Sequence, residues 1–152
     1  MINRLTKTFD EVLRPLWKRP NRVQVAALCY RKKKGRKEVL LITTRGTGRW
    51  MLPKGWPMDG KTGAEAARIE AWEEAGVRSG TVSRRPVGVF DYMKNHDDGL
   101  VEPCTATVYP IKVDKVLKDY PESGERKRKW VGIEKAAKMV DEDSLSELLL
   151  DF

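Results

Sequence analysis

The pattern of hydrophobic and polar positions predicts strands mixed with helices. Apolar runs at Val23 to Tyr30 and Glu38 to Thr44 are typical of two buried strands. The basic run between them, residues 31–37, predicts a solvated hairpin turn rather than a binding patch. Other apolar segments follow in the second half, and we expect strands at Thr81 to Tyr92, Cys104 to Val113 and Lys129 to Ile133.

Four segments have helical spacing. Apolar residues spaced three or four apart predict helices at Asn3 to Leu16, Thr62 to Ala75, Glu134 to Val140 and Ser144 to Leu150. Gly76 follows the second helix directly and predicts a left-handed cap there. Predicted strands and helices are mixed along the chain, and the chain ends in two helices. This order indicates an α/β fold, with a mixed β-sheet sandwiched by helices.

Composition narrows the class of protein. The chain has 152 residues, with 30 Lys and Arg against 22 Asp and Glu, so its net charge is +8 and one domain over residues 1–152 is expected. Cys29 and Cys104 lie in apolar segments and are interpreted as reduced core residues. His96 is the only histidine, which excludes His-rich zinc sites. No secretory signal or membrane-spanning run is evident, so we expect a cytoplasmic protein.

The helix predicted after the Pro- and Gly-rich loop carries the strongest chemical signal. Glu70, Glu73 and Glu74 fall on one arc of this helix, beside a stripe of alanines. Lysines of a basic chain could neutralise three such carboxylates, and an acidic helix face is often only solvated. The same geometry also suits a divalent cation, because Mg²⁺ prefers carboxylate oxygens and brings waters and substrate phosphates with it.

Two phosphate motifs overlap at this point. Residues 55–62 satisfy the P-loop pattern G-x4-G-K-[ST], between a short apolar segment and a helix. The competing pattern, G-x5-E-x7-R-E-U-x-E-E-x-G-U, is the box of the Nudix hydrolases. It places Gly55, the three glutamates, Gly76 and Val77 correctly, and Ala71 is a weaker match. A P-loop gives no reason for three carboxylates along the helix, so the Nudix pattern is favoured.

The resemblance extends beyond the box. The segments at residues 27–31, 40–45, 88–90 and 124–136 resemble the diphosphoinositol polyphosphate phosphohydrolase branch of the Nudix hydrolases. The likeness covers about residues 22–142 and implies a Nudix-type α/β/α sandwich with a mixed sheet. It also implies metal-dependent hydrolysis of a diphosphate bond by water attack at phosphorus, with Mg²⁺ or Mn²⁺ as cofactor.

The resemblance also implies residue roles. Glu70, Glu74 and the backbone carbonyl of Gly55 would be metal ligands, and Glu73 would be a further ligand or the catalytic base, with Glu70 the other catalytic candidate. The sequence departs from the box at Lys61 and Ile69, where the family has glutamate and arginine that pair with each other. Losing both partners is easier than losing one, which suggests a rebuilt support beneath intact ligands.

Basic residues are expected to bind the substrate. The candidates match or neighbour substrate-facing positions of the family and are Arg22, Arg45, Lys54, Arg126 and Lys127. They suit a nucleoside diphosphate linked to another group or an inositol pyrophosphate. Pro53-Lys54-Gly55 looks instead like the dinucleoside polyphosphate hydrolases, which we keep as an alternative, and a non-catalytic RNA-binding module is a third. The expected partner is a small-molecule polyphosphate, with neither a membrane nor a nucleic acid.

Overall fold

A computed structural model describes residues 20–152, and the predicted helix Asn3 to Leu16 lies outside this range. The elements in chain order are β1 (Arg22–Lys33), β2 (Arg36–Thr43), β3 (Trp50–Met51), β4 (Lys54–Gly55), α2 (Gly63–Ala75), β5 (Val77–Val82), β6 (Gly88–Asn95), β7 (Val101–Val116), β8 (Arg128–Gly132), α3 (Ile133–Met139) and α4 (Asp143–Asp151). No helix in the described range is long and apolar enough to cross a membrane.

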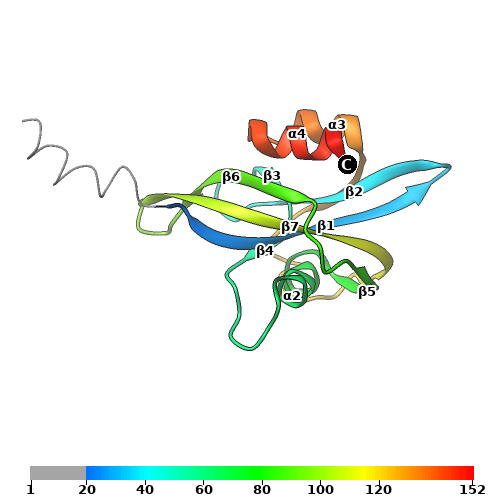
Figure 1. The fold of residues 1–152 in the computed structure, drawn as a ribbon, viewed down its shortest axis with the longest axis horizontal. Coiled ribbons are helices and arrows are strands. Elements are labelled where there is room, and N and C mark those ends of the chain that lie inside the picture. Colours follow the sequence, from blue (N-terminus) through cyan, green and yellow to red (C-terminus); the bar gives the residue numbers. More distant parts are fainter. Residues whose placement is uncertain (1–19) are drawn as a thin grey trace, which may run out of the picture.

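The strands form one mixed sheet, as the sequence predicts. Its main path is β3-β2-β1-β7-β5, and β1 runs parallel to β7 while the other pairs are antiparallel. Strands β4, β6 and β8 pair with β1, β7 and β2 respectively. Helix α2 covers one face of the sheet, and α3 and α4 cover the other (Figure 1). The α/β/α sandwich expected from the sequence is therefore confirmed.

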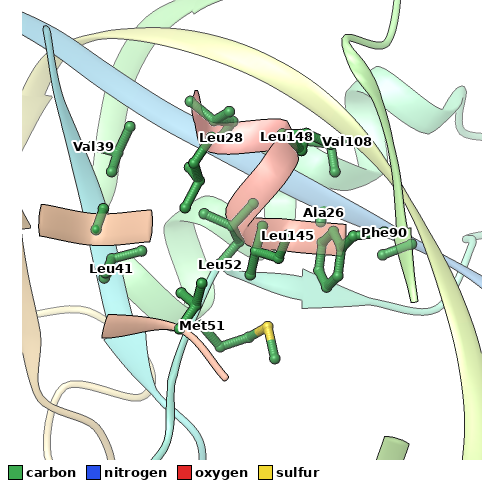
Figure 2. Close-up of a cluster of buried hydrophobic side chains, with 14 of the residues drawn as sticks. Ala26, Leu28, Val39, Leu41, Met51, Leu52, Phe90, Val108, Leu145 and Leu148 are labelled. Atoms are coloured by element: carbon green, nitrogen blue, oxygen red, sulfur yellow. The ribbon is translucent and has the colours of Figure 1, made fainter. Parts of the chain in front are cut away.

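Each face of the sheet has its own hydrophobic core. On the α3 and α4 side, Leu145 and Leu148 of α4 lie among strand side chains such as Phe90 (Figure 2). On the α2 side, alanines at 67, 71 and 75 pack against β1 and β2, because small side chains let the helix lie close to the sheet. Cys29 and Cys104 are buried and free, which confirms their interpretation as reduced core residues.

The predicted hairpin turn is wrong in its length. Strands β1 and β2 continue into the basic run and stay paired up to Lys33 and Arg36. Only Lys34 and Gly35 form the turn, with φ of 52° and 76°. Positive φ at both central residues suits the twist of a two-residue hairpin, so five of the six basic side chains lie on strands and only Lys34 lies in the turn.

Two further differences concern the second half of the sheet and the loop before α2. The predicted strand Thr81 to Tyr92 is interrupted between β5 and β6, and both parts pair with β7. The break contains Pro86, which has no N–H to donate to the neighbouring strand. The loop before α2 is not wholly irregular, because Lys54 and Gly55 pair with β1 as the two-residue strand β4.

Candidate active site

Helix α2 carries the three glutamates. It begins after Thr62, whose hydroxyl accepts a hydrogen bond from the Glu65 N–H at 3.1 Å, and it ends at Gly76 with φ of 72°. Both caps agree with the predicted helix. Within it, Glu70 and Glu74 are 8% and 6% exposed, and Glu73 is half-buried. A solvated helix face would leave such side chains exposed. Buried carboxylates need hydrogen-bond donors or cations as partners.

Strand β4 brings backbone groups to these carboxylates. The Lys54 N–H donates to Oε2 of Glu74 at 3.0 Å. Gly55 lies against Glu70 so closely that a Cβ added to it would be 2.1 Å from Oε1 of Glu70. Only glycine leaves room for the Glu70 carboxylate at this position. The Gly55 backbone and both buried carboxylates therefore lie in one small region.

Arg126 lies behind Glu74. Its Nη2 donates to Oε1 of Glu74 at 3.1 Å and to Oε1 of Glu122 at 3.0 Å, and its Nη1 donates to the Thr43 carbonyl at 3.1 Å. The Arg126 side chain is 7% exposed. It is thus a built-in partner of a site carboxylate, a contact that the sequence gives no means of predicting.

The negative charge of Glu70 has no ion-pair partner among the described residues. Burial, followed by the nearby Glu74 and Glu73 charges, raises the pKa of Glu70 to about 8. Burial also raises the pKa of Glu74, although Arg126 and Lys54 act in the opposite direction. Burial lowers the pKa of Lys54, whose ammonium lies 4.8 Å from the Tyr92 ring centroid. A divalent cation would relieve the repulsion that makes ionised Glu70 unfavourable.

The donor set fits a hard cation. Carboxylate and carbonyl oxygens are the ligands that Mg²⁺ and Mn²⁺ take, and each engaged Glu74 oxygen keeps a second lone pair. Among residues 20–152, no three His, Cys, Asp or Glu side chains form a metal-binding group by themselves. Mg²⁺ commonly uses one or two carboxylates and completes its shell with waters and substrate phosphates. Glu70 and Glu74 would supply these carboxylates, and the Gly55 backbone lies beside Glu70.

These pKa shifts predict an unusual pH dependence of stability. The folded protein keeps the Glu70 proton up to about pH 8, whereas the unfolded chain releases it near 4.5. The folded state thus binds more protons between these values, so the free energy of unfolding falls as pH rises through this window. Thermal unfolding in a chelator should give a Tm several degrees lower at pH 8 than at pH 5. Glu70→Gln should flatten this dependence, and a parent Tm that rises with pH would contradict the assignment.

A basic pocket of about 260 Å³ lies beside the carboxylates. Of the predicted substrate cations, Arg45, Lys54 and Arg126 line it. Arg22 and Lys127 do not line this pocket. Arg22 stacks on Trp56 at 4.0 Å and pairs with Glu102 at 3.2 Å, and Lys127 is exposed on the segment that pairs with Thr43.

The pocket also contains polar residues that the sequence analysis missed. These residues come from the loop before β3 and from the β6–β7 hairpin. They include Thr44, Thr47, Arg49, Lys94 and His96. Arg49 pairs with Glu142 at 2.9 Å, which ties the pocket wall to the start of α4. The loop before β3 and the β6–β7 hairpin are far apart in sequence. Only the register of the strands in the sheet could have indicated that these two segments lie side by side.

The two departures from the box lie at different depths. Lys61 is exposed before the start of α2, and Ile69 is half-buried. Glu70 follows Lys61 by nine residues, or about 13 Å along a helix. Lys61 and Thr62, which would contact the phosphates and the cation in a P-loop, are therefore at the N-terminal end of α2, away from the buried carboxylates, whereas Gly55 lies against Glu70.

Comparison with known proteins extends the resemblance. The NUDIX domain family matches residues 20–151. Diphosphoinositol polyphosphate phosphohydrolase 3-alpha of Homo sapiens is 33% identical over 120 residues, covering 77% of this chain and 68% of that protein. Nudix hydrolase 12, mitochondrial, of Arabidopsis thaliana is 30% identical over 118 residues, covering 76% of this chain. The chain spans only 58% of the length of that plant relative.

Solved structures support the same architecture. The Ap4A hydrolase of C. elegans superposes with a TM-score of 0.65 and 24% sequence identity, covering 88% of this chain and 96% of that one. At this identity the likeness establishes the fold. Taken with a family match that spans nearly every described residue, it shows that the chain belongs to the NUDIX domain family.

Proposed function

We propose that the protein is a metal-dependent pyrophosphohydrolase. Its substrate would be a nucleoside diphosphate linked to another group or an inositol pyrophosphate. The observation that carries this proposal is the pair of buried carboxylates beside strand β4, with Glu70 against Gly55 and Glu74 accepting from the Lys54 N–H. Family membership agrees with this chemistry. Mg²⁺ or Mn²⁺ is the proposed cofactor, held by both carboxylates and the Gly55 carbonyl.

The roles of the residues follow from their surroundings. The bound cation would acidify a water and offset phosphate charge as the bond breaks. Glu73 is one turn from Glu70 and, among the described residues, its carboxylate has no ion pair or side-chain hydrogen bond, so it can accept the proton of the attacking water. Arg126 holds Glu74 in place through its contact with Oε1.

The pocket supports a densely anionic small molecule. Arg45, Lys54 and Arg126 come from three separate segments and converge on it, and cations of this kind bind phosphate groups. One relative is a diphosphoinositol polyphosphate phosphohydrolase and one structural neighbour is an Ap4A hydrolase. We favour an inositol pyrophosphate and keep a dinucleoside polyphosphate as the alternative, because Pro53-Lys54-Gly55 looks like that group. A cytoplasmic location stays a prediction, since several relatives are named mitochondrial or chloroplastic.

A substrate panel tests the proposal. Inositol pyrophosphates, dinucleoside polyphosphates, nucleotide sugars and nucleoside triphosphates would each be incubated with Mg²⁺ or Mn²⁺ and the products identified. We expect cleavage of a phosphoanhydride bond that stops when a chelator is added. No hydrolysis of any member, together with retention of RNA at physiological salt, would favour the non-catalytic binding module instead.

Loss of a substrate cation should act on affinity more than on turnover. Arg45 is 62% exposed and its contacts to Glu122 and Glu125 are long, at 3.9 and 3.6 Å, so its guanidinium is available to a phosphate. Arg45→Ala should therefore raise KM by about tenfold with a smaller change in kcat. Steady-state kinetics measures both constants. Arg126→Ala is the contrasting variant, because it frees Glu74 and should lower kcat; a fall in kcat alone for Arg45→Ala would contradict the assignment.

A further inference from the structure

Most of the excess positive charge of the chain is concentrated at one place in the fold. Residues 31–37 contain six Lys and Arg and no Asp or Glu, so the rest of the chain carries a net charge of only +2. This run forms the tip of the β1–β2 hairpin, which projects beyond α3 and α4 at one end of the sheet (Figure 1). We name residues 31–37 the basic ribbon.

The basic ribbon places like charges directly opposite each other. Lys32 pairs in register with Lys37, and Lys33 pairs with Arg36. Such cross-strand pairs destabilise a hairpin in isolation. Successive side chains of a strand point to opposite faces, so Lys32 and Lys33 present charge on both faces of the ribbon. An arrangement that only kept the edge soluble would not require charge on both.

Two of the six cations are already engaged. Arg31 pairs with Glu38 at 2.9 Å and lies 4.2 Å from the Trp130 ring centroid. Lys37 donates to the Phe152 carbonyl at 2.8 Å. Within residues 20–152, the other four have no carboxylate partner and are exposed, namely Lys32, Lys33, Lys34 and Arg36.

A groove runs beside the ribbon. It has a volume of about 970 Å³ and lies between the ribbon and the start of α3. Its basic lining includes Lys33, Arg36 and Lys135, and Glu38 and Glu134 also border it.

The basic ribbon is far from the buried carboxylates of the candidate active site. Val25 pairs with Gly55, and Lys33 is eight residues further along β1, or about 26 Å at strand spacing.

We propose that the basic ribbon binds duplex DNA through its phosphate backbone, with the two strands entering the major groove. A two-stranded ribbon fits that groove, and its two phosphate walls would face the cations on both faces of the ribbon. A flat lipid surface would meet only one face. Single-stranded nucleic acid is bound by stacking on aromatic rings, and residues 31–37 contain none. The surface is independent of the hydrolytic site. The proposal departs from the sequence analysis, which favoured a solvated turn over a binding patch for this run and expected no nucleic-acid partner.

The test removes three of the free cations without disturbing the hairpin. In the variant Lys32→Gln/Lys33→Gln/Lys34→Asn, asparagine suits the positive φ of 52° at residue 34. The matched control, Arg84→Gln/Arg85→Gln/Lys138→Gln, removes three exposed cations elsewhere in the described chain. Fluorescence anisotropy would follow binding to a duplex of about 20 base pairs as salt is raised from about 50 to 300 mM.

The expected result is quantitative. Each phosphate contact contributes about 0.9 to the slope of log affinity against log salt, so the ribbon variant should lose about 2 to 3 from that slope. Its affinity at low salt should fall more than about tenfold, while the control variant binds as the parent does. Hydrolysis by the ribbon variant should be unchanged, which separates this inference from the proposed function. Absence of parent binding at low salt, equal weakening in the control, or ribbon-dependent binding to phosphatidylserine vesicles but not to DNA would each overturn it.

Discussion

Replacing Glu74 by glutamine should lower kcat by about 100-fold or more, whereas Lys61→Ala should leave most activity intact. Glu74 is 6% exposed and accepts hydrogen bonds from Arg126 and from the Lys54 N–H. Glutamine keeps the shape but removes the charge that a cation requires. Lys61 is exposed at the far end of α2, so its loss removes no contact with the carboxylates.

Metal binding separates this interpretation from the P-loop alternative. Calorimetric titration with Mg²⁺ or Mn²⁺ should show binding to the parent that weakens sharply in Glu74→Gln and is retained in Lys61→Ala. The Tm of each variant is the control for folding, because Glu74→Gln replaces the charged partner of the Arg126 guanidinium by a neutral amide. An inactive Lys61→Ala protein beside an active Glu74→Gln protein would reverse the assignment in favour of the P-loop.

The sequence predicts best where a local rule decides the structure. The bounds of α2 follow from the Thr62 cap and from Gly76, and the alanine stripe identifies the face that packs on the sheet. The two wrong strand boundaries, at the β1–β2 turn and between β5 and β6, have local causes as well. Like charges in residues 31–37 suggested a loop, but the turn needed only Lys34 and Gly35. The single strand predicted from Thr81 to Tyr92 ran across the polar residues 83–85 and Pro86, where the structure has the break between β5 and β6.

Contacts between distant segments could not be predicted in the same way. Arg126 was expected to face the substrate, and the structure shows that it lines the pocket while also holding Glu74 and Glu122. This double role depends on β8 pairing with β2, which brings residue 126 beside Thr43. Arg49 also lines the pocket, and its pair with Glu142 connects it to a segment that is distant in sequence. No periodicity within either segment carries that information.

The close approach of Gly55 to Glu70 gives the second large prediction. An added Cβ at residue 55 would lie 2.1 Å from Oε1, 2.3 Å from Cδ and 2.8 Å from Oε2 of Glu70, so the carboxylate must move. The displaced group is the end of a flexible side chain, and the rest of the helix can stay in place. Gly55→Ala should therefore lower kcat by about 100-fold, the scale of a 1 Å misplacement, while changing Tm only slightly.

Gly63→Ala is the matched control for this substitution. Its Cβ would lie 2.2 Å from the Tyr109 hydroxyl, again at the end of a side chain, but at the first turn of α2 and away from the carboxylates. Both variants thus force one side chain to move, and only Gly55→Ala moves a proposed metal ligand. The kcat of Gly63→Ala should stay within about twofold of the parent value, because this substitution does not move the carboxylates. If Gly55→Ala kept full activity with a normal metal titration, Glu70 would not be a ligand; if both variants lost activity together with Tm, the effect would lie in the stability of the helix and not in the position of its carboxylate.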